Sequence, residues 1–424
     1  MTHSLSRSSR YVVLFTAIGG LLFDGVELGL MPVASLSVSQ SLLGDAFTPT
    51  LGGDWFARFT AALMLGAAVG GIFLGSLGDR IGRTRALGVS VLFYSVFAGL
   101  GALVKTQEQM LVLRFMVGLG VGGVWPNAVA LAAECWPDKS RPIIAGLMGA
   151  ALNGGILMLS QIARTWHITP ESWRWIFQLA AAPAVLGVLA LTVIPESPLW
   201  LASRNARRKR ESSGSAAPRS TSALRELFRP PLLRRTLIGI LIGSIPMVGA
   251  WAASKWMIPW ADKVGGATEA GYKAITQGWW ALGAVLGSFL GAQIAAWLGR
   301  RRAYAIISAG ATVFTSLMFL GTAPLQASFL PIVFAQGFVA TLFFGWLPLY
   351  LPELFPTRVR AAGSGIAYNV GRFATALGVL AAGGLFAAMG GSYPKVGATC
   401  GLIYLLGLIV IWWAPDTTDK KLDA

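Results

Sequence analysis

The sequence predicts an all-α membrane protein with twelve transmembrane helices, arranged as two six-helix halves that repeat each other in parallel orientation. Of its 424 residues, 55% are hydrophobic and 12% are charged, whereas charged residues make up roughly 25% of a typical soluble protein. Apolar runs of about 20 residues, the length that crosses a bilayer as a helix, follow one another along the chain. Short motifs recur in the second half at nearly one spacing, which indicates a duplicated fold.

The helices are expected where apolar runs of spanning length end at charged residues. The predicted ranges are 11–36, 55–77, 86–104, 109–132, 142–163, 173–194, 236–257, 275–298, 303–321, 328–351, 361–388 and 393–413. These spans and their short loops leave no room for a sizeable soluble domain. We therefore divide the chain into a first six-helix half at 1–202, a basic linker at 203–235 and a second six-helix half at 236–424.

Loops after the even-numbered helices are rich in Lys and Arg, which places them in the cytoplasm by the positive-inside rule. They contain Arg80, Arg83, Arg85, Lys139, Arg141, the linker, Arg300, Arg301, Arg302, Arg358 and Arg360. Both termini are therefore expected in the cytoplasm, with the protein in a bacterial inner membrane. The linker is expected to be flexible, with one short amphipathic helix at 223–228 on the membrane surface.

Three motifs carry the repeat. Glu134-x-x-Pro-x-x-x-Arg141 recurs as Glu353-x-x-Pro-x-x-x-Arg360. The motif Leu-x-x-x-x-Gly-Arg-x-Arg at 77–85 recurs at 294–302, with Ile as its first residue, and Pro-Glu-Ser at 195–197 recurs as Pro-Asp-Thr at 415–417. Parallel repeats of this kind place a substrate site at mid-depth between the two halves.

Several longer motifs point to a known superfamily. GSLGDRIGRTR at 75–85 resembles the loop between helices 2 and 3 in the major facilitator superfamily. PESPLWL at 195–201, WRWIF at 173–177 and PELFPTRVRAAGSG at 352–365 resemble its branch of sugar porters, aromatic acid:proton symporters and organic ion transporters. FDGVELGLMPVA at 23–34 resembles helix 1 of the aromatic acid:proton symporters. The resemblance implies the major facilitator fold and secondary transport by alternating access.

Asp24 and Glu27 are acidic residues within the first predicted helix. They are three positions apart, so they share a helix face about 4.5 Å apart along the axis. Ionisable residues inside a membrane are costly and mark proton relays or binding sites. We therefore predict that Asp24 and Glu27 couple transport to protons. Arg114, before the glycine run of helix 4, is a further candidate. Val124 stands where many relatives have Glu, which removes a helix 4 carboxylate from the candidates.

Arg372 is expected inside helix 11, about 16 Å from its start at 1.5 Å per residue. Its guanidinium stays charged and pairs with carboxylates through two parallel hydrogen bonds. Arg372 is therefore the predicted anchor of a substrate carboxylate, with a permanent ion pair to Asp24 or Glu27 as the alternative. The other predicted substrate-binding residues are Asn369, Tyr368, Trp125, Trp346 and Asn153. Lys255 is expected near the outer end of helix 7, reaching to the membrane interface, with attraction of an anion as the alternative.

Charges at the inner helix ends recur in both halves and are predicted to form a cytoplasmic gate. They are Asp79, Arg83, Glu134, Arg141, Glu196, Glu353, Arg360 and Asp416. Pairs between the halves are expected to hold the inner side shut when the site opens outward. Ala296 stands where the first half has Asp79, so the second half has one charge fewer.

The sequence favours proton-coupled import of a small organic anion, a monocarboxylate that is possibly aromatic. The alternatives are a sugar or polyol porter, a drug or organic cation:proton antiporter, and a membrane sensor or binding protein that does not transport. The two cysteines and two histidines form no metal-ligand cluster, and no nucleophile with a base or phosphate-binding loop appears. We expect no enzymatic activity, cofactor, metal or nucleic-acid partner; the expected partners are the anion, protons and the lipid bilayer, and the protein is expected to be a monomer.

Overall fold

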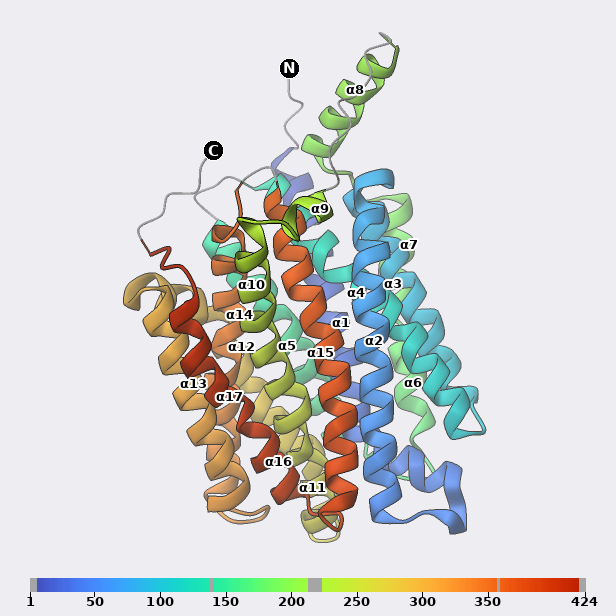
Figure 1. Ribbon diagram of the computed structural model, residues 1–424. Helices are drawn as coiled ribbons and strands as arrows, with labels where there is room; N and C mark the ends of the chain where they lie inside the picture. Colours follow the sequence, from blue (N-terminus) through green and yellow to red (C-terminus); the bar gives the residue numbers. More distant parts are fainter. Residues whose placement is uncertain (1–5, 137–140, 213–222, 357–358, 419–424) are drawn as a thin grey trace.

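The structure, a computed structural model, describes residues 6–136, 141–212, 223–356 and 359–418. These residues form helices, turns and connecting segments, and no strand occurs among them. In the described part of the chain, twelve helical segments are long and apolar enough to cross a membrane, which confirms the predicted number. They stand side by side in one bundle (Figure 1).

The first half consists of six spans. They are α1 (Arg7–Leu43), α2 (Pro49–Ile81), α3 (Arg83–Leu100), α4 (Gln107–Cys135), α5 (Arg141–Thr165) and a sixth span made of α6 (Arg174–Ala180) and α7 (Ala184–Thr192). Pro183 lies at the break between α6 and α7. Proline cannot donate a backbone hydrogen bond within a helix, which explains why this span is divided.

The second half begins with a span of mixed helix types. α10 (Leu232–Val248) continues through a π-helical segment (Gly249–Ala253) and a 3-10 turn (Ser254–Trp256) into α11 (Met257–Gly265). The other spans are α12 (Tyr272–Leu298), α13 (Arg300–Ser316) with the π-helical turn Leu317–Gly321, α14 (Phe329–Glu353), α15 (Arg360–Ala388), and α16 (Tyr393–Gly401) with α17 (Ile403–Val410).

Two further helices lie between the halves in sequence. α9 (Ala223–Leu227) is helical as predicted. α8 (Pro198–Ser212) is also a helix, so the first part of the linker is ordered where the sequence suggested a flexible tether. Both helices lie at the end of the bundle where α1 begins and α17 leads to the last described residues (Figure 1). We call this end the linker side and the opposite end the far side.

Glycines form the closest helix contacts within each half. A Cβ atom at Gly66 of α2 would lie 2.1 Å from the Phe115 carbonyl oxygen of α4, and one at Gly283 of α12 would lie 2.2 Å from the Phe334 carbonyl oxygen of α14. These matched contacts repeat the α2–α4 pair as α12–α14, because small residues let helix backbones approach closely. Gly82, at a φ of +111°, turns the chain from α2 into α3, a conformation that favours glycine.

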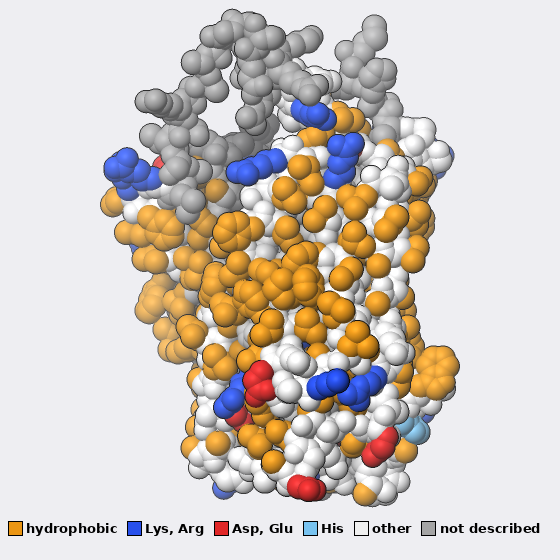
Figure 2. Space-filling model, turned by 90° about the vertical axis from the view of Figure 1, so that its right-hand side faces the viewer, with side chains coloured by type: hydrophobic (Ala, Val, Ile, Leu, Met, Phe, Trp, Pro, Cys, Tyr) orange, Lys and Arg blue, Asp and Glu red, His pale blue; other side chains and the backbone are white. Residues whose placement is uncertain are grey.

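The surface shows where a membrane would surround the molecule. Hydrophobic side chains cover the middle of the face in Figure 2, while Lys and Arg gather toward the linker side and a second set of charged side chains lies toward the far side. Phe15, Phe73 and Trp297 are examples of large apolar side chains that are more than half exposed. An apolar band between two charged edges matches the bilayer core and its two polar surfaces.

Candidate functional site

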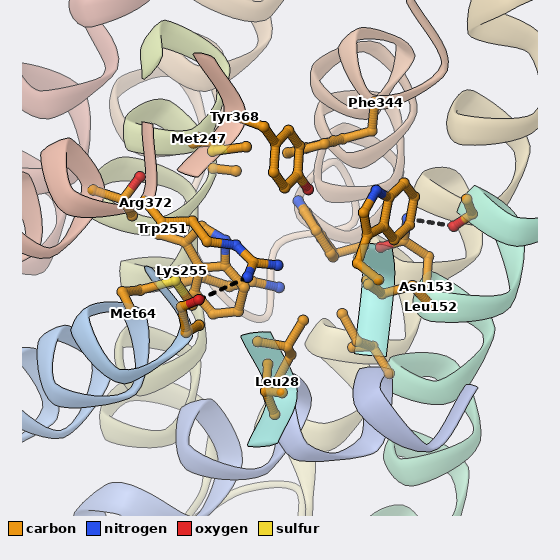
Figure 3. A pocket seen from close by; sticks show the side chains of 18 residues that line it. Leu28, Met64, Leu152, Asn153, Met247, Trp251, Lys255, Phe344, Tyr368 and Arg372 are labelled. Carbon is orange, nitrogen blue, oxygen red and sulfur yellow. Dashed lines mark hydrogen bonds between the residues drawn. The ribbon is translucent and has the colours of Figure 1, made fainter. Parts of the chain in front are cut away.

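A cavity lies between the two halves. Side chains from both halves line it, including Leu28, Met64, Trp125 and Asn153 from the first half and Trp251, Lys255, Trp280, Tyr368 and Arg372 from the second (Figure 3). Most of this lining is apolar or aromatic. A mainly apolar pocket with a few convergent polar groups is the usual form of a small-molecule site.

Arg372 lies in this cavity, as predicted. It projects from the middle of α15, and its Nη1 donates a 3.0 Å hydrogen bond to the Ala67 carbonyl oxygen of α2. Its guanidinium also lies over the Tyr368 ring, 5.3 Å from the centroid. Arg372 forms no ion pair with a carboxylate among the described residues, and its role as the anchor of a substrate carboxylate stays a prediction.

Aromatic and amide side chains complete the predicted lining. Trp125 of α4 and Tyr368 of α15 stack across the two halves, with centroids 6.2 Å apart and planes 9° apart. Both lie toward the linker side of the cavity. Asn153 of α5 donates a 2.8 Å hydrogen bond to Ser288 Oγ of α12, which also joins the halves.

Asp24 lies near the middle of α1, 1% exposed, and is outside the cavity lining. Neither of its carboxylate oxygens has a hydrogen-bond partner in the described structure. It lies within electrostatic range of Arg372 and Glu27. A buried carboxylate without hydrogen bonds is costly in its charged form, which makes Asp24 a suitable place for a proton.

Glu27 has a cationic partner, unlike Asp24. Its Oε2 accepts a 3.2 Å hydrogen bond from Arg114 Nη1, and its backbone carbonyl accepts one of 3.3 Å from Arg114 Nη2. Both side chains are 1% exposed. The structure therefore brings the predicted candidates Glu27 and Arg114 together as a buried pair that joins α1 to α4.

Lys255 is the site residue whose position the sequence interpretation gave wrongly. It is 1% exposed and lies in the cavity, so the expectation that it reaches to the membrane interface is wrong. The predicted helix ended at 257, whereas α11 continues to Gly265 and keeps Lys255 about 15 Å from that end, at 1.5 Å per residue. The π-helical segment beside it was the missing feature, and π-helical turns often occur at functional sites.

Two predicted binding residues lie outside the cavity. Trp346 is fully buried on the linker side, where its indole nitrogen donates a 2.9 Å hydrogen bond to the Arg300 carbonyl oxygen. It packs there against Tyr304 and Tyr350. Asn369 lies one turn closer to the linker side than Arg372 and donates to the Gly365 carbonyl oxygen. Both residues were predicted from their positions within a span, which does not show whether a side chain faces the cavity.

The predicted gate charges form one cluster in each half. In the first half, Arg83 donates to Asp79 and to Glu134, the latter at 3.1 Å. Glu134 also accepts from the Ser197 hydroxyl, and Glu196 accepts a 3.0 Å hydrogen bond from the Thr84 backbone N–H. These contacts tie the linker-side ends of α2, α3 and α4 to the start of α8.

The second half repeats this cluster. Arg300 binds Glu353 through two hydrogen bonds of 3.1 and 2.8 Å, and Glu353 accepts from the Thr417 hydroxyl. Asp416 accepts hydrogen bonds from Thr418, which lower the pKa of the Asp416 carboxyl. The ion pairs of Arg83 with Glu134 and of Arg300 with Glu353 each join residues of the same half.

Two gate residues remain outside these clusters. Arg360 begins α15 on the linker side and forms no ion pair with another described residue. The side chain of Arg141 lies outside the part of the chain that is described.

The halves are joined by hydrogen bonds on the far side. Gln277 Nε2 of α12 donates to the Gly29 carbonyl oxygen at 3.1 Å and to Ser160 Oγ at 3.2 Å. Lys273 Nζ donates to Ser37 Oγ and to Asp262 Oδ2, both at 3.1 Å. These hydrogen bonds hold the two halves together directly on the far side.

The known proteins that this chain resembles, in sequence or in fold, are transporters. A family model described as sugar (and other) transporter matches residues 12–424. A cis,cis-muconate transport protein of Acinetobacter baylyi is 31% identical over 407 residues, which cover 92% of each chain. A probable 4-methylmuconolactone transporter of Cupriavidus pinatubonensis is 28% identical and covers 84% of this chain and 81% of its own. The xylose transporter XylE of E. coli has the same fold, with a TM-score of 0.73 at 18% identity, covering 98% of this chain and 100% of its own.

Proposed function

Because the chain belongs to the sugar (and other) transporter family of the major facilitator superfamily, we propose that it imports a small organic anion together with protons. Members of this family are secondary transporters in membranes and are not enzymes. The proposal adds the chemical class of the substrate and the ion that drives its uptake.

The position of Arg372 is the observation that carries the proposal. Its guanidinium lies in an apolar cavity between the halves and has no carboxylate partner among the described residues. A cation in such a place needs an anion, and a substrate carboxylate would match its paired donors. The 31% identical relative is named for cis,cis-muconate, which is also an organic anion.

Other substrate classes fit the cavity less well. None of the described residues that line the cavity is acidic, so an organic cation would meet Arg372 and Lys255 without an opposing charge. A sugar offers no anionic group to the guanidinium of Arg372. The cavity therefore favours anions over the two alternative substrate classes.

Asp24 and Arg372 provide a route for coupling. While Asp24 is ionised, its negative charge offsets the nearby guanidinium. A proton on Asp24 removes that negative charge, and Arg372 then attracts a substrate carboxylate more strongly. Glu27 is held by Arg114, so we assign it the second role, that of keeping α1 and α4 together around Asp24.

The orientation follows from charge. We place the linker side in the cytoplasm of an inner membrane, because its loops carry most of the Lys and Arg residues. A proton gradient directed inward then drives symport inward.

Uptake into proteoliposomes tests this function. The purified chain should accumulate radiolabelled cis,cis-muconate when the outside is made acidic, and a protonophore should abolish the accumulation. D-xylose under the same gradient serves as the comparison. Accumulation of xylose without accumulation of the carboxylate would replace the anion with a sugar.

A further inference from the structure

Lys255 gives the cavity a second cation, and the proposed function assigns no substrate group to it. Its Nζ has no hydrogen-bond partner in the described structure, and it forms no ion pair with a described carboxylate. The side chain is 1% exposed and lines the same cavity as Arg372. Leaving a buried ammonium group without an anion is costly, so a helix-packing role alone does not explain it.

The contacts of Lys255 hold its amino group among aromatic rings. Nζ lies 3.3 Å from the centroid of the Trp280 ring and 5.5 Å from that of Trp251. Trp280 is fixed in turn, because its indole nitrogen donates a 2.7 Å hydrogen bond to Gln336. Aromatic faces attract a cation but leave its hydrogen-bond donors free. The ammonium group is thus positioned and still able to bind an anion.

The two cations lie at different levels of the cavity. Gly371, next to Arg372, packs against Met247 of α10, whereas Lys255 is eight residues further along the same span, toward the far side. At 1.5 Å per residue, Lys255 lies about 12 Å further along this span than Met247, and the side chains of Arg372 and Lys255 both line the cavity. Figure 3 shows both residues on the wall that also holds Trp251.

The buried charges suggest how many anionic groups the cavity takes. Glu27 offsets Arg114, and Asp24 offsets Arg372 when it is ionised, which leaves Lys255 as an unmatched cation. When Asp24 carries a proton, Arg372 and Lys255 both lack an opposing charge. Two carboxylates would then neutralise the site, one at each level.

We infer that the substrate is a dicarboxylate with an apolar middle, held by Arg372 at one carboxylate and by Lys255 at the other. This inference rests on the proposed function and replaces the monocarboxylate that the sequence suggested. Lys255 then determines specificity, because it distinguishes a second carboxylate from a neutral group of the same shape.

Binding to the purified full-length chain tests the inference, with two matched series as probes. One series is hexanedioate, its monoamide and hexanoate, and the other is benzene-1,4-dicarboxylate, 4-carbamoylbenzoate and benzoate. Wild-type protein should bind at least one dicarboxylate tenfold or more tightly than its monoamide. Lys255→Met should remove this preference by weakening the dicarboxylate while leaving the monoamide unchanged.

Two controls accompany Lys255→Met. Lys263→Met changes an exposed lysine of the same span and should keep the wild-type preference. The melting temperature of Lys255→Met without ligand should equal or exceed that of wild type, because an unmatched buried charge is removed. A folded variant with altered preference then reflects recognition rather than damage.

The outcomes separate the inference from the proposed function. If wild type binds and transports monocarboxylates as well as dicarboxylates, or if Lys255→Met weakens acid and monoamide equally, the dicarboxylate inference is wrong and anion transport stands. If no carboxylate in either series binds or is transported, both are wrong.

Discussion

At the scale of single residues, we propose that transport depends on three charges that have no close partner of opposite sign among the described residues. Asp24, Lys255 and Arg372 are held inside the bundle without an ion pair among the described residues. Charges in such places are costly within a membrane and mark the path of a substrate or proton. Glu27 and Arg114, by contrast, satisfy each other. We therefore propose that the three unpaired residues bind substrate or protons, whereas Glu27 and Arg114 stabilise the fold.

Arg372→Lys should lose most binding of the carboxylate although the charge is kept. Lysine cannot present two parallel donors to a carboxylate, and it does not reproduce the flat contact with Tyr368. Losing one charge-assisted hydrogen bond weakens binding by about 1.5–3 kcal/mol, or roughly ten- to a hundredfold. Calorimetry with the wild-type ligand checks this, and equal affinity of wild type for an acid and its amide would contradict the role of Arg372.

Asp24→Asn should uncouple transport from protons. Asparagine resembles a protonated aspartate in shape and charge but cannot release a proton. A pH gradient should therefore no longer drive accumulation, while exchange of labelled for unlabelled substrate continues in part. Glu27→Gln is the comparison, since it removes the charge that holds Arg114 and should also lower the melting temperature. Gradient-driven accumulation that survives in both variants would move the coupling site elsewhere.

At the scale of helices, the contact between α1 and α5 sets the position of Asp24. The two helices meet through Gly25 and Gly155: a Cβ at Gly25 would lie 1.8 Å from the Leu152 carbonyl oxygen, and one at Gly155 would lie 1.7 Å from the Leu22 carbonyl oxygen. No side chain fits there unless the backbones move apart. Gly25 is the residue after Asp24, so any such movement would also displace the carboxylate.

Gly155→Ala should therefore destabilise the protein, by about 1–3 kcal/mol as for other overpacked sites. Its neighbour provides the matched control, because a Cβ at Gly154 meets no atom within 4 Å. Gly154→Ala should be neutral or stabilising by up to about 1 kcal/mol, since alanine favours helix. Thermal melting of the two variants beside wild type measures the difference. Similar melting temperatures for both would mean that the α1–α5 contact is not tight.

The helices were more predictable than the faces they present. Apolar length alone gave the twelve spans, because a bilayer demands about 20 apolar residues per helix. The same criterion ended helix 7 too early and therefore placed Lys255 at the membrane surface. The length of an apolar run does not show that a lysine inside it faces a cavity. Trp346 and Trp125 are both aromatic residues inside spans, yet only Trp125 faces the cavity. The packing of the helices against one another determines which side of each helix faces the cavity. This packing cannot be predicted from one sequence.

At the scale of the whole molecule, the two ends of the bundle are held in different ways. Gln277 and Lys273 link the halves on the far side, while the linker-side ion pairs Arg83–Glu134 and Arg300–Glu353 each join residues of the same half. Alternating access requires the reverse arrangement in the other state, with contacts between halves on the linker side. We expect the repeated linker-side charges to make those contacts.

Neutralising these charges should shift the balance between the two states. Glu134→Gln or Glu353→Gln should favour the state open on the linker side by up to a few kcal/mol, with substrate preference unchanged. Gln277→Leu should act in the opposite direction by loosening the far side. Single cysteines near the linker-side end of α5 or α15 would report the shift through their labelling rate. Unchanged labelling with altered substrate preference would instead place these acidic residues in the binding site.

Proton entry during substrate uptake tests proton-coupled anion transport most directly. Proteoliposomes that contain the wild-type chain and an internal pH indicator are given an inward gradient of cis,cis-muconate, with equal pH on both sides at the start. We expect the interior to acidify as the substrate enters, and we expect no acidification with Asp24→Asn. Entry of substrate without any change of internal pH in the wild-type vesicles would contradict the coupling of anion and proton.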